Sequence, residues 1–212
     1  MNTITTNPGW RVQLAIHRAV RRDTARLAAA LEDGRDASVE PVRAYWAVSA
    51  AQLHHHHEFE DTVAWELMIE RLGEGFAALL TRNARQHEAM AASMAEFDAA
   101  LASTDVTAAR GALERMRQAI ESHLSAEEAD VLPLIPQAFT AEDIAYFQAE
   151  AAKGNPPPVF LPWLLDDAPA EDLAFFTERL PAPVREQLEA VWAPTWRHAV
   201  EALGTRSEVP AS

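Results

Sequence analysis

Four long segments with a helical pattern of apolar and polar residues follow one another from near the start of the chain. In each, apolar residues recur at alternating steps of three and four, which places them on one face of an α-helix. The segments span about residues 8–33, 38–72, 74–103 and 106–137. Asn7-Pro8 would cap the first, Gly34 and Gly73 would end the first two, and Thr104-Asp105 would turn the chain before the fourth. Long helices joined by short loops predict an all-α, up-down-up-down four-helix bundle.

The predicted inward face of each helix is apolar at both ends and carries His, alone or with Glu, nearer its middle. The positions on the first two faces are Trp10, Leu14, His17, Val20, Thr24, Leu27 and Leu31, then Val42, Trp46, Ser49, Leu53, His56, Glu60, Val63 and Leu67. Those on the last two are Phe76, Leu80, Asn83, His87, Met90, Met94, Phe97 and Leu101, then Leu113, Met116, Ile120, His123, Glu127, Val131 and Leu134.

Six of these interrupting residues should meet in one layer of the bundle, because residues of antiparallel helices lie at equal height when they are equally far from the connecting turn. They are His17, His56, Glu60, His87, His123 and Glu127. Burying them without compensation would cost many kcal/mol, and bound cations offset that cost. A His and carboxylate set without Cys suits iron, zinc or manganese. Paired ligands one turn apart on two helices are typical of di-metal carboxylate sites.

A run of four histidines, His54 to His57, requires a choice of ligand. The spacing from His56 to Glu60 repeats the spacing from His123 to Glu127, and the apolar face of the second helix selects the same His56. The alternative pair, His57 with Asp61, lies one position (~100°) away from that face. We therefore predict His56 as the ligand, with His54 and His55 at the surface or in a supporting role.

Composition narrows the class of protein further. The formal net charge of −14 repels phosphates and anionic lipid, so we expect no nucleic-acid and no membrane partner. The absence of Cys excludes disulfides and thiolate metal sites. The first ten residues have neither a basic nor an apolar stretch typical of a secretory signal, and no segment has the ~20 apolar residues that span a bilayer. A cytoplasmic protein is expected.

The chain divides into a metal-binding bundle over residues 8–138 and a carboxy-terminal extension over residues 139–212. The extension is predicted to hold a helix over 140–153, an irregular apolar stretch over 159–165, and helices over 170–180 and 183–203. No residue pattern in it suggests chemistry. We expect it to pack on the bundle or to form a subunit interface, which would give a homodimer.

Several motifs in this order resemble the hemerythrin-like, cation-binding HHE domain family. They are Ile16-His17-Arg18, His55-His56 through Glu60-Asp61 and Trp65, His87, His123-Leu124-Ser125-Ala126-Glu127-Glu128, and Val131-Leu132-Pro133-Leu134. The resemblance covers about residues 8–138, and the remainder looks like an extension of bacterial members. It implies that the six residues are iron ligands, with Glu60 and Glu127 bridging two irons that also share an oxo or hydroxo group.

The chain departs from the oxygen-carrying members at two positions. Those proteins have a second His one turn along the third helix, whereas this chain has Asn83 and Ala91 there, and Glu66 replaces a usual Pro. The sequence therefore predicts a site one His short, either more open or mononuclear. We favour a protein that binds O₂ or NO for sensing, storage or stress defence, because no redox partner domain is evident in the sequence. The alternatives are a di-iron enzyme acting on peroxide, NO or O₂, and a store or sensor of iron or another metal.

Overall fold

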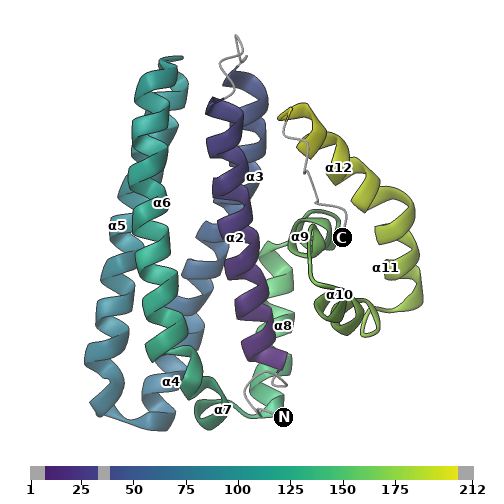
Figure 1. Ribbon diagram of the computed structural model, residues 1–212. Helices are drawn as coiled ribbons and strands as arrows, with labels where there is room; N and C mark the ends of the chain where they lie inside the picture. The colour runs from purple at the N-terminus through teal and green to yellow at the C-terminus, as the bar shows by residue number, and fades with distance from the viewer. Residues whose placement is uncertain (1–7, 33–38, 205–212) are drawn as a thin grey trace.

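The structure, a computed structural model, describes residues 8–32 and 39–204. These residues form helices joined by turns, with no strand among them, as the all-α prediction requires. Figure 1 shows four long helical columns side by side, with a layer of shorter helices against one side of them. The expected cap at Asn7 and the expected stop at Gly34 lie outside the described residues.

The four columns are close to the four predicted segments. They consist of α2 (Pro8–Glu32); α3 (Val39–Phe59), which continues through a π-helical turn (Glu60–Ala64) into α4 (Trp65–Leu72); a 3₁₀ turn (Glu74–Phe76) with α5 (Ala77–Ala102); and α6 (Val106–Asp130). A second 3₁₀ turn (Leu132–Leu134) leads into the short α7 (Ile135–Ala138).

Two of the connections between columns are tight turns at the predicted residues. Gly73 adopts φ 86°, a left-handed conformation that glycine tolerates and most residues do not, and the chain reverses there between α4 and α5. Between α5 and α6, the Asp105 side chain accepts a hydrogen bond from the Ala108 amide and caps α6. Short connections of this kind keep neighbouring columns antiparallel and at matching heights.

The predicted inward faces are confirmed as the core of the bundle over most of their length. Leu27, Leu53, Phe97 and Met116 are among the large side chains that are fully buried. Apart from two positions beyond Glu60, four predicted core positions at or near the ends of the faces are only half-buried: Leu14, Phe76, Met94 and Leu134. The core is therefore continuous along the bundle, and the polar residues at its middle are surrounded by apolar layers.

The second predicted face is wrong beyond Glu60, because the helix there is not an α-helix. In the π-helical turn the Trp65 amide bonds the Glu60 carbonyl five residues back, which inserts one extra residue into the turn. The fully buried positions consequently move by one, to Ala64 and Met68, while Val63 and Leu67 are half-buried. Single π-turns of this type are frequent at functional sites.

The remaining helices lie beside the bundle on the side of α2 and α3 (Figure 1). They are α8 (Ala141–Gly154), α9 (Pro157–Leu165), α10 (Ala170–Thr177), α11 (Ala182–Gln187), a π-helical turn (Leu188–Trp192) and α12 (Ala193–Ala202). The prediction of an irregular stretch over 159–165 is wrong, because Pro157 and Pro158 fit the first turn of a helix, where the amide that proline lacks has no partner. Trp163 of this helix is fully buried in the main core.

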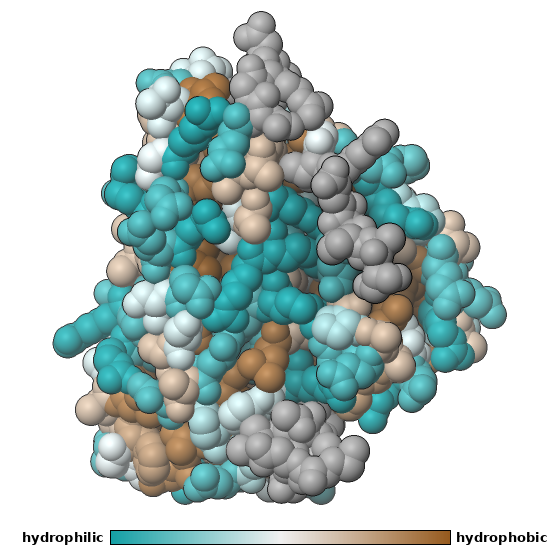
Figure 2. Space-filling view, in the orientation of Figure 1, coloured by the Kyte–Doolittle hydropathy of each residue, from teal (hydrophilic) through white to brown (hydrophobic). Residues whose placement is uncertain are grey.

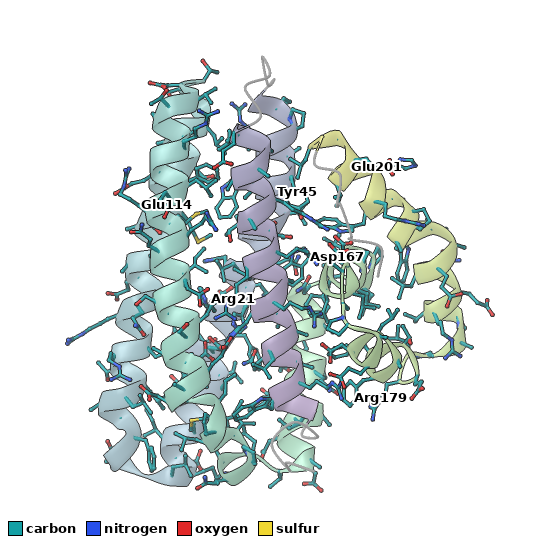
Figure 3. All side chains as sticks on the ribbon, in the orientation of Figure 1. Arg21, Tyr45, Glu114, Asp167, Arg179 and Glu201 are labelled. Atoms are coloured by element: carbon teal, nitrogen blue, oxygen red, sulfur yellow. The ribbon has the colours of Figure 1, made fainter. Side chains whose placement is uncertain are left out.

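A buried carboxylate connects α9 to the bundle. Asp23 of α2 is 1% exposed, and it accepts hydrogen bonds from Tyr45 Oη at 2.6 Å, from Trp163 Nε1 at 2.7 Å and from the Ser49 hydroxyl. Arg22 completes its shell at 2.7 Å. Figure 3 shows Tyr45 and Asp167 at the boundary between the bundle and the carboxy-terminal helices. The extension thus shares core residues and buried polar contacts with the bundle.

The outer surface agrees with the acidic, polar composition. Figure 2 shows a mostly hydrophilic face over α2 and α6, with hydrophobic residues gathered at the lower end, where α4 and the start of α5 lie. Among the helices of residues 8–32 and 39–204, none combines the length and the apolar character needed to cross a membrane.

Candidate metal centre

Histidine and glutamate side chains from all four columns meet in a buried layer of the bundle. Each of the six predicted ligands is at most 6% exposed, and His17, Glu60, His123 and Glu127 have no measurable exposure. A seventh buried residue, His57, belongs to the same layer. Among the described residues, three overlapping groups have ligand atoms within 4.8 Å of one another: His17, His56 and Glu127; His57, His87 and His123; Glu60, His123 and Glu127.

Glu60 lies between histidines of two different columns. Its Oε1 is 3.4 Å from His56 Nε2, and its Oε2 is 3.6 Å from His87 Nε2. Both distances exceed those of hydrogen bonds, but they suit two ligand atoms that contact one cation. The two oxygens of this single carboxylate therefore face two different imidazoles.

Glu127 occupies the corresponding position on α6. Its Oε2 is 3.4 Å from His17 Nε2 and 3.3 Å from His123 Nε2. The i, i+4 spacing of His123 and Glu127 puts both side chains on the inward face of α6, as the same spacing does for His56 and Glu60 on α3. Each carboxylate thus lies between one imidazole of the group that contains His17 and one imidazole of the group that contains His87.

The inward-facing atoms of this layer lack hydrogen-bond partners. Among the described residues, the buried and unpaired atoms include Nε2 of all five histidines, Oε2 of Glu60 and both carboxylate oxygens of Glu127. Leaving one such group unpaired costs about 1–3 kcal/mol, and this layer contains eight of them. Bound cations remove that cost, because they convert unpaired acceptors into ligands. The donor set therefore fits metal ions of the iron, zinc and manganese class.

The outward nitrogens of two of these histidines are held by carboxylates. His17 Nδ1 donates to Glu128 Oε1 at 2.9 Å, and His87 Nδ1 donates to Asp61 Oδ2 at 2.9 Å. Arg21 Nη1 in turn holds Glu128 at 2.6 Å, and Figure 3 shows Arg21 between α2 and α6. A carboxylate only accepts, so the proton of a neutral imidazole lies on Nδ1 and the Nε2 lone pair points inward. Histidine ligands of metals usually carry such an outer partner.

The comparison with protein families agrees with this geometry. The family profile of the hemerythrin HHE cation binding domain matches residues 9–135, which is more than half of the chain. The chain belongs to the hemerythrin HHE family. Comparisons with curated proteins and with solved structures gave no match. The matched range begins in α2 and ends in α7, so it contains all seven buried residues of the hemerythrin HHE site.

The prediction that placed His57 outside the inward layer is wrong. The His57 ring is 7% exposed and stacks on that of His87, with centroids 4.1 Å apart. His56 instead lies beside His17, with ring centroids 5.5 Å apart. Since α3 packs between α2 and α5, its buried face is wide enough for two adjacent positions, and each points to a different neighbouring column. The signal in the sequence was the His56-His57 pair itself, which a single-row face cannot represent.

The other two histidines of the run do not face the layer. His54 is exposed, and His55 is half-buried with its Nε2 donating to the Ala151 carbonyl of α8 at 3.0 Å. These positions agree with the surface or supporting role that the sequence predicted. Asn83, one turn from His87, accepts a hydrogen bond from Trp65 Nε1 at 3.2 Å and is satisfied within the core.

Burial and mutual charge shift the protonation of the site in opposite directions. Burial raises the pKa of Glu60 well above that of a free carboxyl, and the neighbouring Glu127 raises it further. Burial also opposes ionisation of Glu127, but the adjacent His17 and His123 outweigh it and hold the pKa of Glu127 well below its usual range. For His17, burial is outweighed by Glu127 and Glu128, so its pKa rises to about 9. Burial lowers the pKa of His56 and of His57.

Proposed function

We propose that this hemerythrin HHE protein is a non-haem di-iron protein that binds O₂ or NO at an open iron position, for sensing, storage or stress defence. The observation that carries the proposal is the position of Glu60, whose two oxygens face imidazoles of different groups. Glu127 also lies between two imidazoles, but it faces both His17 and His123 with the same oxygen, Oε2. One iron would be held by His57, His87 and His123, and the other by His17 and His56, with both carboxylates shared.

The two proposed iron positions would be unequal, which supports binding of a small ligand. Three imidazoles would hold one iron and two imidazoles the other, beside the same two carboxylates. The position with fewer protein ligands would leave room for a diatomic molecule. When bound, a reduced iron pair supplies the electrons and the Lewis acidity with which O₂ or NO is held.

The chain's own residues provide a dry and oriented site for that ligand. His56 is at most 6% exposed and Glu60 has no exposure, so bulk water is excluded from the layer. Gln13 of α2 reaches the same place, because its Nε2 donates to Glu60 Oε1 at 2.9 Å. The second N–H of this amide would be placed to donate a hydrogen bond to a diatomic molecule bound beside Glu60.

The experiment is anaerobic titration of the iron-loaded, reduced protein with O₂ and, separately, with NO. We expect a saturable absorbance change at one gas molecule per chain, reversed when the gas is removed. Gln13→Ala should speed release of the gas. The matched control is Gln118→Ala, which changes the same residue type at an exposed position of α6. Steady consumption of O₂, NO or added peroxide, with no saturation, would contradict binding and indicate an enzyme.

A further inference from the structure

A cavity separates the metal layer from the carboxy-terminal helices. Its volume is ≈ 500 Å³, and its walls come from α2, α3, α4 and α7 on the side of the bundle and from α8 to α11 on the other side. Volumes of about 300–1,000 Å³ are typical of sites for small organic ligands. The cavity exists because the extension packs on the bundle, so the bundle alone would not form it.

The walls of the cavity are chiefly aromatic and aliphatic. Aromatic side chains enter it from five of the surrounding helices, among them Phe59, Trp65, Phe147, Phe160 and Phe176. Apart from His55 and His56, Arg179 is the only basic or acidic residue among those that line it. Its guanidinium lies 3.7 Å from the Phe175 ring centroid and donates to the Phe175 carbonyl at 2.6 Å, so it is already paired. No acidic residue lines the cavity to pair with a cation, and the one guanidinium belongs to an exposed residue whose charge is screened by water. The walls therefore favour a neutral molecule.

One end of the cavity carries an unsatisfied acceptor. Asn155 Nδ2 donates to Gln52 Oε1 at 2.6 Å, whereas Asn155 Oδ1 is buried with no partner. Both residues line the cavity. A buried carbonyl oxygen without a donor costs about 1–3 kcal/mol, and a ligand that offers an N–H or O–H group would remove that cost.

We propose that the cavity binds a small, neutral, mainly apolar organic molecule that donates one hydrogen bond to Asn155 Oδ1. The apolar walls would bury its hydrocarbon part, and the Gln52–Asn155 pair would fix its orientation. The sequence alone does not reveal this site, because its residues are spread over eight helices and become neighbours only in the fold.

The site also adjoins the metal layer. His56 and Gln13 both line the cavity, and Gln13 Nε2 donates to Glu60. A molecule in the cavity therefore contacts one candidate ligand directly and a second through Gln13. This coupling rests on the proposed function, whereas binding in the cavity does not, so the two parts are tested separately.

Binding is tested with N-phenyl-1-naphthylamine, a neutral apolar fluorophore with one N–H group, on the full chain before and after iron loading. We expect saturable fluorescence enhancement at one probe per chain and tighter binding than for 8-anilinonaphthalene-1-sulfonate, which adds a charge to the same rings. Ala151→Phe should weaken binding at least about tenfold by filling the cavity. Ala149→Phe, exposed on the same helix and outside the walls, is the matched control and should leave binding unchanged.

The hydrogen bond is tested with Asn155→Leu, which should weaken the amine probe about three- to tenfold. The affinity of 2-phenylnaphthalene, which has no hydrogen-bond donor, is measured by its displacement of the amine probe. This affinity should differ little between Asn155→Leu and the unsubstituted protein. Absence of probe binding, tighter binding of the sulfonate, or equal loss in Ala151→Phe and Ala149→Phe would overturn the proposal.

The coupling is tested by adding 1-adamantanol, which is neutral and transparent, to the iron-loaded protein. We expect the iron absorption bands to shift and the shift to saturate at the same concentration that displaces the fluorophore. Bands that stay unshifted when all the fluorophore is displaced would refute the coupling. If the protein holds no iron, the proposed function fails while the fluorescence titration still decides whether the cavity binds.

Discussion

The imidazole of His57 stacks on that of His87, with ring centroids 4.1 Å apart and an interplanar angle of 15°. Both Nε2 atoms are buried without hydrogen-bond partners. Two adjacent imidazoles with unpaired nitrogens are costly unless a cation accepts both lone pairs. If both imidazoles bind metal, His57 of α3 would supply the imidazole that the third column lacks.

Substituting His57 should therefore remove one of the two metals selectively. In His57→Ala we expect the metal content to fall from about two towards one ion per chain. Loss of a residue that only hydrogen-bonds a metal ligand weakens metal binding about 10–100-fold, and loss of His57 itself should weaken it more. Elemental analysis after desalting measures it. His54→Ala, an exposed neighbour in the same run, is the control, and equal loss in both variants would refute the assignment.

Asp61 should support metal binding without contacting the metal. Its carboxylate accepts from His87 Nδ1, and Asp61→Ala would free that ring to rotate and lower its basicity. We expect about 10–100-fold weaker metal binding in a competition titration with a chelator, at unchanged helical content. Glu58→Ala removes an exposed carboxylate three residues away and should change affinity by less than about twofold, so matching losses would indicate a general charge effect.

Metal affinity should increase with pH from about 6 to 9. The pKa of His17 without metal is raised to about 9, so below that pH a proton occupies the nitrogen that the metal requires. The raised pKa of Glu60 adds a second competing proton. Proton release on metal addition in weakly buffered solution, measured with an indicator dye at pH 7, should approach about two per chain. The His17→Ala variant should release fewer protons. A metal affinity that does not change with pH would contradict the prediction.

Stability should depend on Asp23 far more than on surface carboxylates. Asp23→Ala leaves the Tyr45, Ser49 and Trp163 donors unpaired in the core, with an expected cost of about 3–5 kcal/mol in urea denaturation. Asp130→Ala breaks only the exposed pair with Arg82 and should cost about 0–1 kcal/mol. Similar losses in the two variants would mean that α9 is not held to the bundle through Asp23.

The sequence was sufficient for the four columns and for the height at which their polar residues meet. A period of three and four residues describes one row of an α-helix, and Val20, Leu53, Met90 and Ile120 are buried as that row requires. The same description fails where a helix buries two rows, which is the case at His57. It also fails where the helical period changes, as it does in the π-turn after Glu60.

The carboxy-terminal third was less predictable because its order depends on distant partners. Trp163 is fixed by a hydrogen bond to Asp23, 140 residues earlier in the chain, and the prolines at the start of α9 obscured a helix. Local patterns contain no information on such pairings. The cavity between α8, α9 and the bundle follows from them, and so it could not be anticipated either.

The most direct test of the central claim is the metal content and absorption spectrum of the aerobically purified full chain. We expect two irons per chain, with near-ultraviolet bands of a bridged ferric pair that are lost in Glu127→Ala while helical content is kept. A single zinc per chain, or iron that stays at two per chain in Glu127→Ala, would contradict it.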